Sequence, residues 1–214
     1  MAATSATTVA AKGKGRLKRQ ASEAALIEAF ERVVQRNGLR NVGVNEVIKE
    51  AGIGKALLYR YFGGLPGLVR AWGEHRNVWP DMSEFRDLPD DPEADTRVLL
   101  KRMILHHANA LREDPVRVEI IAEQFMKPTP ISEALQEIRA QLGEEHQLIF
   151  MKHAAVREHR SLVRFLMGAV SFLAMRAVKA PRYMGEDLGD DVAWGNAMQE
   201  VEAIIDAMLP VRSA

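Results

Sequence analysis

The N-terminal third of the chain carries apolar residues every three or four positions, which is the spacing of one face of an α-helix. The first such segment begins at Ser22, a favourable N-cap residue, and ends at Gly38, a residue type that commonly terminates helices. Its periodic apolar positions are Leu26, Ile27, Phe30, Val33 and Val34. The pattern therefore predicts a first helix from Ser22 to Gly38 with one buried face.

Three shorter segments continue the same spacing. A second helix, closed by Gly52, is marked by Val44, Val47 and Ile48. The third lies in GIGKALLYRYFGG, residues 52–64, and ends at a Gly-Gly pair. Pro66 stands where a fourth helix would open, because proline is favoured in the first turn of a helix.

Prolines divide the rest of the chain into helix-sized pieces. A loop rich in Asp and Pro, residues 81–95, comes first. The five helices that we expect after it span residues 95–113, 115–127, 130–154, 156–180 and 187–209. No stretch shows sustained alternation of period two, so the sequence predicts an all-α fold.

The pattern also divides the chain into three parts. Residues 1–20 are small, polar and basic, with nothing to bury, and are predicted to form a disordered arm. Residues 21–72 hold the short helices and residues 73–214 hold the long ones. We therefore expect an N-terminal helical domain followed by a larger helical domain.

Charge is unevenly distributed along the chain. Its 214 residues include 29 basic and 29 acidic groups, which balance. Residues 1–62 contain 11 basic and 5 acidic groups, a net of +6, and the remaining 152 residues carry a net of −6. A basic end joined to an acidic body indicates that the N-terminal part is the one that meets a polyanion.

Several classes of function have no support in the sequence. The absence of cysteine excludes disulfides, thiol nucleophiles and thiolate metal sites. The six histidines show no HExxH spacing, so we expect no metal. No nucleophile motif, phosphate-binding glycine loop or dinucleotide motif is present, so we expect no enzyme activity and no cofactor.

The sequence also indicates the cellular compartment of the protein. The longest uncharged run of the body, FLMGAVSFLAM, has 11 residues, whereas a membrane-spanning helix needs roughly 20. At the N-terminus the small apolar residues precede the charged ones, which is the reverse of a signal peptide. We therefore expect a cytoplasmic protein that does not enter a membrane.

Residues 52–64 combine apolar, aromatic and basic groups in one short element. Two short helices joined at residues 51–54 fit a helix-turn-helix, whose second helix packs one face inward while the other enters a groove of DNA. The inward residues would be Ile53, Leu58 and Phe62. The outward residues, which could bond phosphate oxygens or base edges, would be Lys55, Tyr59 and Tyr61. A solvated amphipathic helix with half-buried aromatic residues is the alternative that these residues leave open.

The N-terminal domain resembles the DNA-binding domain of the TetR family of transcriptional regulators. The resemblance lies in the first helix, in VGVNEVIKEAGIGKALLYRYF (residues 42–62), and in a helix that opens near Leu68. It covers residues 22–72, about a quarter of the chain. The family resemblance implies a DNA-binding head on a helical ligand-binding and dimerisation domain.

The resemblance also implies which residues contact DNA. Tyr59 matches a phosphate-binding tyrosine, Tyr61 replaces a histidine that touches phosphate, and Lys55 and Ala56 stand where base edges are commonly reached. The full set of implied DNA-binding residues is Asn45, Lys55, Ala56, Leu57, Tyr59, Arg60 and Tyr61. The arm, residues 1–20, could add phosphate or minor-groove contacts or could serve only as a solubilising tail.

Some positions depart from the family pattern. Leu57 replaces the usual threonine and Leu65 replaces a lysine that holds backbone phosphate, while Gly43 and Gly54 stand where hydroxyl caps are usual. These losses support an alternative from another class, a helical small-molecule-binding protein with a weakened or lost DNA-binding head.

The body suggests a dimer. The segment 156–180 is apolar nearly all round, and a helix of that kind has to be covered on several sides. We expect its small residues, Gly168, Ala169, Ala174 and Ala177, to approach a second subunit. The last helix would offer Val201, Ile204, Ile205 and Met208 to the same homodimer interface, which resembles the paired C-terminal helices of the family. A monomer with a fully internal core is the alternative.

Methionine and aromatic residues favour a pocket for a small apolar or aromatic effector, and the family resemblance implies that their helices surround such a cavity. An ordinary role in the hydrophobic core is the alternative. The candidate ligand-binding residues are Trp72, Trp79, Met103, His107, Phe125, Met126, Phe150 and Met151. The sequence therefore predicts a ligand-responsive transcriptional regulator, a repressor, that acts as a homodimer on palindromic double-stranded DNA.

Overall fold

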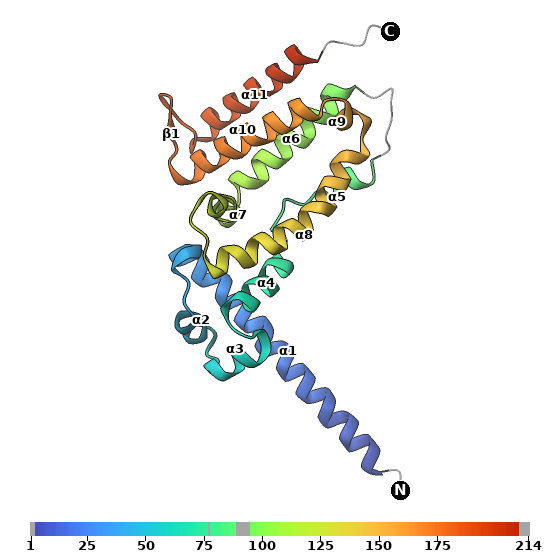
Figure 1. Cartoon of the computed structure of the whole chain (residues 1–214), viewed down its shortest axis with the longest axis vertical. Coiled ribbons are helices and arrows are strands. Elements are labelled where there is room, and N and C mark those ends of the chain that lie inside the picture. Colours follow the sequence, from blue (N-terminus) through green and yellow to red (C-terminus); the bar gives the residue numbers. More distant parts are fainter. Residues whose placement is uncertain (1–2, 77, 89–94, 210–214) are drawn as a thin grey trace. The chain divides into compact units, whose positions relative to one another are not determined.

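The computed structural model describes residues 3–76, 78–88 and 95–209, and Figure 1 shows that they are almost entirely helical. Residues 1–2 of the predicted arm, residues 89–94 of the predicted loop and Pro210 lie outside this range. The elements in order are α1 (Ala3–Asn37), η1 (Leu39–Asn41), α2 (Val44–Ala51), α3 (Lys55–Phe62), α4 (Leu65–Arg76), α5 (Ser83–Arg86), α6 (Thr96–Arg112), α7 (Pro115–Ala122), η2 (Glu123–Phe125), α8 (Pro130–Lys152), α9 (Ala154–Glu158), α10 (Arg160–Lys179), β1 (Arg182–Tyr183), β2 (Glu186–Asp187) and α11 (Asp191–Met208). The predicted all-α fold is confirmed.

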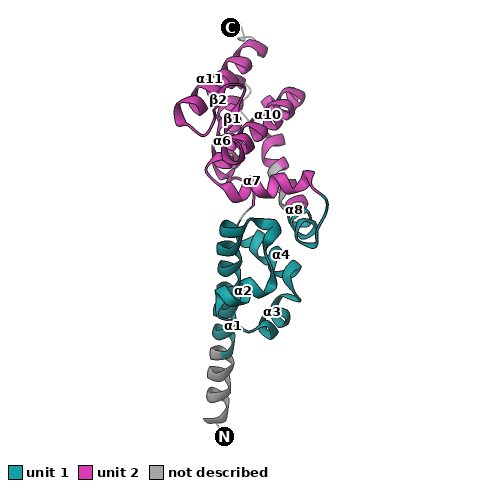
Figure 2. Cartoon of the chain, turned by 90° about the vertical axis from the view of Figure 1, so that its left-hand side faces the viewer, with its two compact units in different colours: residues 1–76, 127–138 teal, residues 77–126, 139–214 magenta. Residues whose placement is uncertain are grey.

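The chain forms two compact units, coloured teal and magenta in Figure 2. Unit 1 comprises residues 1–76 together with residues 127–138, and unit 2 comprises residues 77–126 and 139–214. The sequence placed residues 127–138 in the body, whereas the structure groups them with the N-terminal helices. Within unit 1, a hydrogen bond from Arg40 Nη2 to the carbonyl of Lys127 (3.0 Å) accompanies this grouping.

The first helix is longer than expected. It is continuous from Ala3 to Asn37, so residues 3–20 of the predicted disordered arm are helical. Alanine, lysine, arginine and glutamine favour helices, and extending an existing helix avoids the cost of nucleating a new one. Ser22 is consequently no N-cap, because its hydroxyl donates to the carbonyl of Lys18 (3.0 Å), one turn earlier. The predicted end of the helix is confirmed, since Gly38 has a φ of 77°.

The core of unit 1 joins α1 to α4. Phe30 and Trp72 are at most 1% exposed and meet edge to face, with ring centroids 5.0 Å apart. Beside them the Glu31 carboxylate accepts hydrogen bonds from the Trp72 indole and the Arg76 guanidinium. A half-buried carboxylate with two charge-assisted or polar donors fixes the rotation of α4 against α1.

The core of unit 2 is built mainly from α6, α10 and α11, which run side by side in Figure 1. Its fully buried residues include Leu100, Met103, Ile104, Leu166, Val170, Ala174 and Ile205. Ala174 is 0% exposed within its own unit, so it is not on a free surface. The expectation that Ala174 approaches a second subunit is therefore wrong, because the tight packing of α10 on α6 already uses this position.

The structure also differs from the predicted elements in the loop 81–95, in the segment 156–180 and just before the last helix. The segment 156–180 is divided into α9 and α10 at His159, and the predicted loop 81–95 contains α5 with the fully buried Phe85. The carbonyl of Phe85 faces Nε2 of the buried His153 at 3.1 Å, which ties α5 to the turn before α9. A two-residue hairpin turn with positive φ at Met184 and Gly185 precedes α11.

By length and composition alone, α10 is apolar enough to cross a membrane, the one such helix in the described part of the chain. It carries Arg164 and Arg176, and it packs on α6 within unit 2. A core helix passes the same test, so this feature is weak evidence for a membrane.

The approach of α4 to α3 depends on Gly67. A Cβ atom at this position would lie 1.8 Å from the carbonyl oxygen of Phe62 and 2.9 Å from its carbon. Because the neighbour is backbone rather than a flexible side chain, any larger residue would force the two helices apart.

We predict that Gly67→Ala destabilises unit 1 by about 1–3 kcal/mol, as overpacking commonly does. The melting temperature should fall by about 2–4 °C for each kcal/mol. Gly15→Ala is the matched control, because Gly15 lies inside α1 with no atom within 4 Å of the added carbon. It should be neutral or slightly stabilising. Equal melting temperatures for the Gly67 variant and the parent would contradict the close contact.

Candidate nucleic-acid interface

Helices α2 and α3 are joined by a tight turn. The left-handed conformation of Gly52 (φ 64°) ends α2, and its N–H and that of Ile53 bond to the carbonyls of Lys49 and Ile48 at 3.3 and 3.1 Å. On α3, Leu58 is fully buried and anchors the inner face. Gly63 (φ 72°) ends α3 in the same way. The two-helix motif predicted from the sequence is therefore present.

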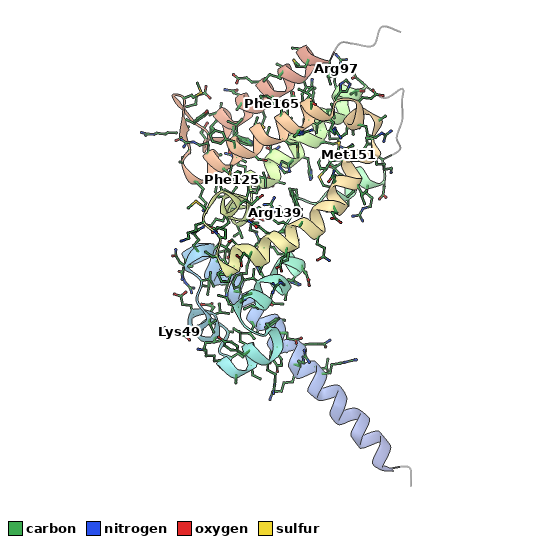
Figure 3. The ribbon with its side chains drawn as sticks, viewed as in Figure 1. Lys49, Arg97, Phe125, Arg139, Met151 and Phe165 are labelled. Carbon is green, nitrogen blue, oxygen red and sulfur yellow. The ribbon has the colours of Figure 1, made fainter. Side chains whose placement is uncertain are left out.

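The outer surface of this motif carries most of the predicted DNA-binding residues. Asn45 on α2 and Lys55, Ala56 and Arg60 on α3 are exposed, and Tyr59 is 48% exposed. Leu57 and Tyr61 are half-buried. Lys49, labelled in Figure 3, is a further exposed cation on α2 and is not among the residues predicted to bind DNA.

Tyr59 is held in place by its neighbours. Its ring lies against Gly64, where an added Cβ would be 3.6 Å from Cε1 of the ring. The ammonium group of Lys55 stands 5.9 Å from the ring centroid. The ring is therefore oriented while much of its surface stays open to solvent, which suits a phenol that donates to a phosphate oxygen.

Tyr61 lies between two arginines. Arg60 Nη2 donates to its hydroxyl (3.0 Å), and the guanidinium carbons of Arg60 and Arg19 stand 5.0 and 5.3 Å from its ring centroid. Arg19 also pairs with Glu23 (2.7 Å), whose carboxylate raises the pKa of the guanidinium. Tyr61 is therefore the centre of a basic cluster.

An open groove of about 570 Å³ runs beside this cluster, between α1 and α3. It is lined by Gly15, Lys18, Arg19, Ser22, Leu57, Arg60 and Tyr61. The placement of Lys18 and Arg19 beside α3 was missed because their segment was predicted to be disordered. The available signal was the run of basic residues next to a helix of strong periodicity.

The side chain of Glu46 takes the place of the missing hydroxyl cap at the start of α2. The N–H of Gly43 donates to Glu46 Oε2 (3.3 Å), and the Asn37 amide donates to the other oxygen of Glu46 (3.3 Å). Glu46 thus satisfies an end of α2 that Gly43 cannot cap. No side-chain cap is present at Gly54.

The position of α2 on α1 is set by one carboxylate. Glu50 accepts hydrogen bonds from Arg32 (2.8 Å) and Arg36 (3.2 Å). These hydrogen bonds lower the pKa of Glu50, so it stays ionised under ordinary conditions. Because the groups are exposed, the pairs orient the helices more than they stabilise them.

The candidate ligand-binding residues do not form one cluster. Trp72 lies in the interior of unit 1, so it does not belong with the other seven, which are in unit 2. Figure 3 places Phe125 beside α7 and Met151 towards the far end of α8. Phe125 and Met126 are 77% and 54% exposed, so they lie at the surface and do not line an internal cavity.

The remaining candidates line or approach the core of unit 2. Met103 and His107 are buried on α6, and Phe150 and Met151 pack against the core from α8. His107 Nε2 lies 3.1 Å from Ser171 Oγ, and that hydroxyl donates to the carbonyl of Met167. Nε2 is therefore the donor to Ser171. Trp79 is half-buried in unit 2.

No group of three or more potential metal ligands is found within residues 3–76, 78–88 and 95–209. This observation does not test the expectation that the protein binds no metal.

Comparison with known proteins identifies the class. Residues 26–71, which contain the helix-turn-helix, match the family model of the bacterial regulatory proteins, tetR family. The N-terminal domain of this chain thus belongs to the TetR family, and the resemblance seen in the sequence is confirmed. A search of the curated proteins found no match.

A solved structure supports the fold over a longer range. A protein from Streptomyces avermitilis, provisionally described as a TetR transcriptional regulator, is similar with a TM-score of 0.54 and 18% sequence identity. The match covers 85% of this chain and 98% of that one. At this identity the likeness concerns the fold alone.

Proposed function

We propose that this protein is a ligand-responsive transcriptional repressor that binds palindromic DNA as a homodimer in the cytoplasm. The observation that carries the proposal is the TetR-type domain, with Lys55, Tyr59 and Arg60 exposed on α3. An effector in unit 2 would favour a conformation whose two DNA-reading helices no longer match successive major grooves, about 34 Å apart. The expectation of no enzyme activity is consistent with a regulatory domain.

The exposed residues of α2 and α3 differ in the part of the DNA that their side chains can contact. Tyr59 and the arginines near Tyr61 supply donors to phosphate, which hold the domain on DNA of any sequence. Lys55 at the start of α3 and Asn45 on α2 supply donors for base edges, which select a sequence. Leu57 is half-buried and offers methyl groups only, so it could contact a thymine methyl but no polar edge.

The dimer is proposed through exposed apolar residues of α10 and α11. Phe165 (70% exposed) and Phe172 (43%) lie two turns apart on α10 and flank Gly168, which has no atom within 4 Å of an added Cβ. Ile204 (45%) and Met208 (60%) are exposed on α11. Exposed aromatic residues beside a small residue permit close approach of a second copy.

We predict that binding to a selected palindromic duplex weakens steeply between 50 and 200 mM salt, because each neutralised phosphate releases counterions. Tyr59→Phe should weaken all sequences about equally. Lys55→Ala or Asn45→Ala should cost about 1–3 kcal/mol on the preferred sequence and relax base preference. Fluorescence anisotropy with labelled duplexes measures these effects.

Arg182→Ala is the matched control for charge, because Arg182 is an exposed cation on β1 in unit 2. It should leave DNA affinity unchanged. Affinity that is insensitive to salt and to all three interface variants would support the alternative, a helical binding protein whose DNA-binding head has lost its function.

The dimer makes a second prediction. Phe165→Lys should place an unpaired charge in the interface and weaken association by several kcal/mol. Light scattering at micromolar concentration should then report a monomer, and operator affinity should fall. Val98→Lys is the control, because Val98 is also exposed (64%) but lies on α6. A parent protein that is monomeric at this concentration would exclude the interface.

The effector makes a third prediction. Coupling between two binding sites is reciprocal, so a ligand that weakens operator binding tenfold binds the DNA-bound form tenfold more weakly, about 1.4 kcal/mol. Such a ligand should raise the melting temperature of the free protein more than that of the operator complex. Equal stabilisation of both forms by every ligand that binds would indicate a constitutive regulator.

A further inference from the structure

Arg139 on α8, labelled in Figure 3, is a half-buried cation in unit 2. Its guanidinium carbon stands 4.5 Å from the centroid of the Trp79 ring. The Trp79 indole donates to the backbone carbonyl of Arg139 (3.3 Å). One turn further along α8, an added Cβ at Gly143 would lie 3.3 Å from the Trp79 ring. The ring is therefore fixed along α8, with the guanidinium over it.

Of the other arginines that stack on rings in unit 2, Arg176 lies over Tyr183 and donates to the carbonyl of Arg182, whereas two have a carboxylate partner. Arg112 lies over Trp194 and pairs with Asp191 (2.7 Å), and Arg102 lies over Phe85 and pairs with Glu84 (2.5 Å). No carboxylate among the side chains that the structure describes hydrogen-bonds to Arg139 or acts on its pKa. Its positive charge is therefore not balanced by the described part of the protein.

Burial has a measurable consequence for this group. It lowers the pKa of Arg139 to about 10, and burial is the one cause of the shift. The guanidinium thus remains charged near neutral pH, and no other charge in the described residues moves its pKa. Stacking on an aromatic ring offsets only part of the cost of taking an ion from water. An anion that reached this group would provide the missing compensation.

We propose that Arg139 and Trp79 bind the carboxylate end of an organic acid with an apolar or aromatic body. The inference rests on the proposed function, because it names the chemical class of the effector of unit 2. A planar guanidinium matches a carboxylate with two parallel hydrogen bonds. One isolated positive charge matches one negative charge, so a monocarboxylate fits better than a phosphate dianion, whose second charge would stay unpaired.

The test uses the full-length protein and matched pairs of probes. Benzoate, naphthalene-2-carboxylate and decanoate are each compared with the corresponding primary amide by titration calorimetry and thermal shift. We expect at least one acid to bind about tenfold more tightly than its amide, or about 1.4 kcal/mol. Arg139→Gln should reduce the affinity of the acid to that of the amide and leave the amide unchanged. Arg139→Lys should be intermediate, since it keeps the charge and loses the planar fork.

Arg102→Gln is the control, because it removes a stacked arginine that already has a carboxylate partner. It should not alter the preference for the acid. Equal binding of acid and amide, an equal loss of both in Arg139→Gln, or no binding by any acid of the panel would overturn the proposal.

A further variant separates binding from structure. Arg139→Met should keep or raise the melting temperature without ligand, because it removes an uncompensated charge, and should abolish stabilisation by the acid. A fall in melting temperature of more than about 4 °C would assign Arg139 a structural role instead. Operator binding by the parent is measured alongside, since its absence would refute the regulator without affecting the acid-binding result.

Discussion

The contact between the end of α3 and the start of α4 is the constraint on which the DNA-binding surface depends. Because Gly67 has no side chain, α4 can reach the carbonyl of Phe62, and the two helices share one compact core. Glu31 then fixes α4 on α1 through Trp72 and Arg76. With α1, α3 and α4 held together in this core, α3 presents its polar and aromatic face to solvent. A surface that must match a DNA groove gains from such a rigid support.

The parts of this fold that could be predicted are those with local causes. Helices α2 and α3 were predicted because their apolar spacing and terminal glycines lie within one or two turns. The helix before Ser22 was missed, because its segment has good helix formers but no apolar period to reveal it. The role of Gly67 depends on a neighbour from another helix, and no local pattern encodes that distance. The hairpin before α11 has strands of two residues, too short for alternation to appear.

The candidate DNA-binding residues and the candidate ligand-binding residues differ in how much the sequence says about their positions. The candidate DNA-binding residues were chosen through the family pattern, which assigns positions on two short helices, and the structure places most of them at the surface. The ligand-binding residues were chosen by residue type, which does not say where a side chain lies. Trp72 is consequently in the core of unit 1 and Phe125 is on the surface of unit 2. Arg139 was overlooked, because an isolated arginine in a sequence does not reveal whether a carboxylate will meet it.

Both proposed ligands are anions, but the protein would recognise them by opposite means. The N-terminal part, with its net charge of +6, meets DNA through exposed cations, whose attraction is long-ranged and screened by salt. The rest of the chain has a net charge of −6, so its surface field disfavours an acid. An acid can be retained there only where a cation is desolvated, because burial strengthens the local interaction and weakens its screening. Arg139 over Trp79 meets that condition, so binding of the acid should depend on salt far less than binding of DNA does.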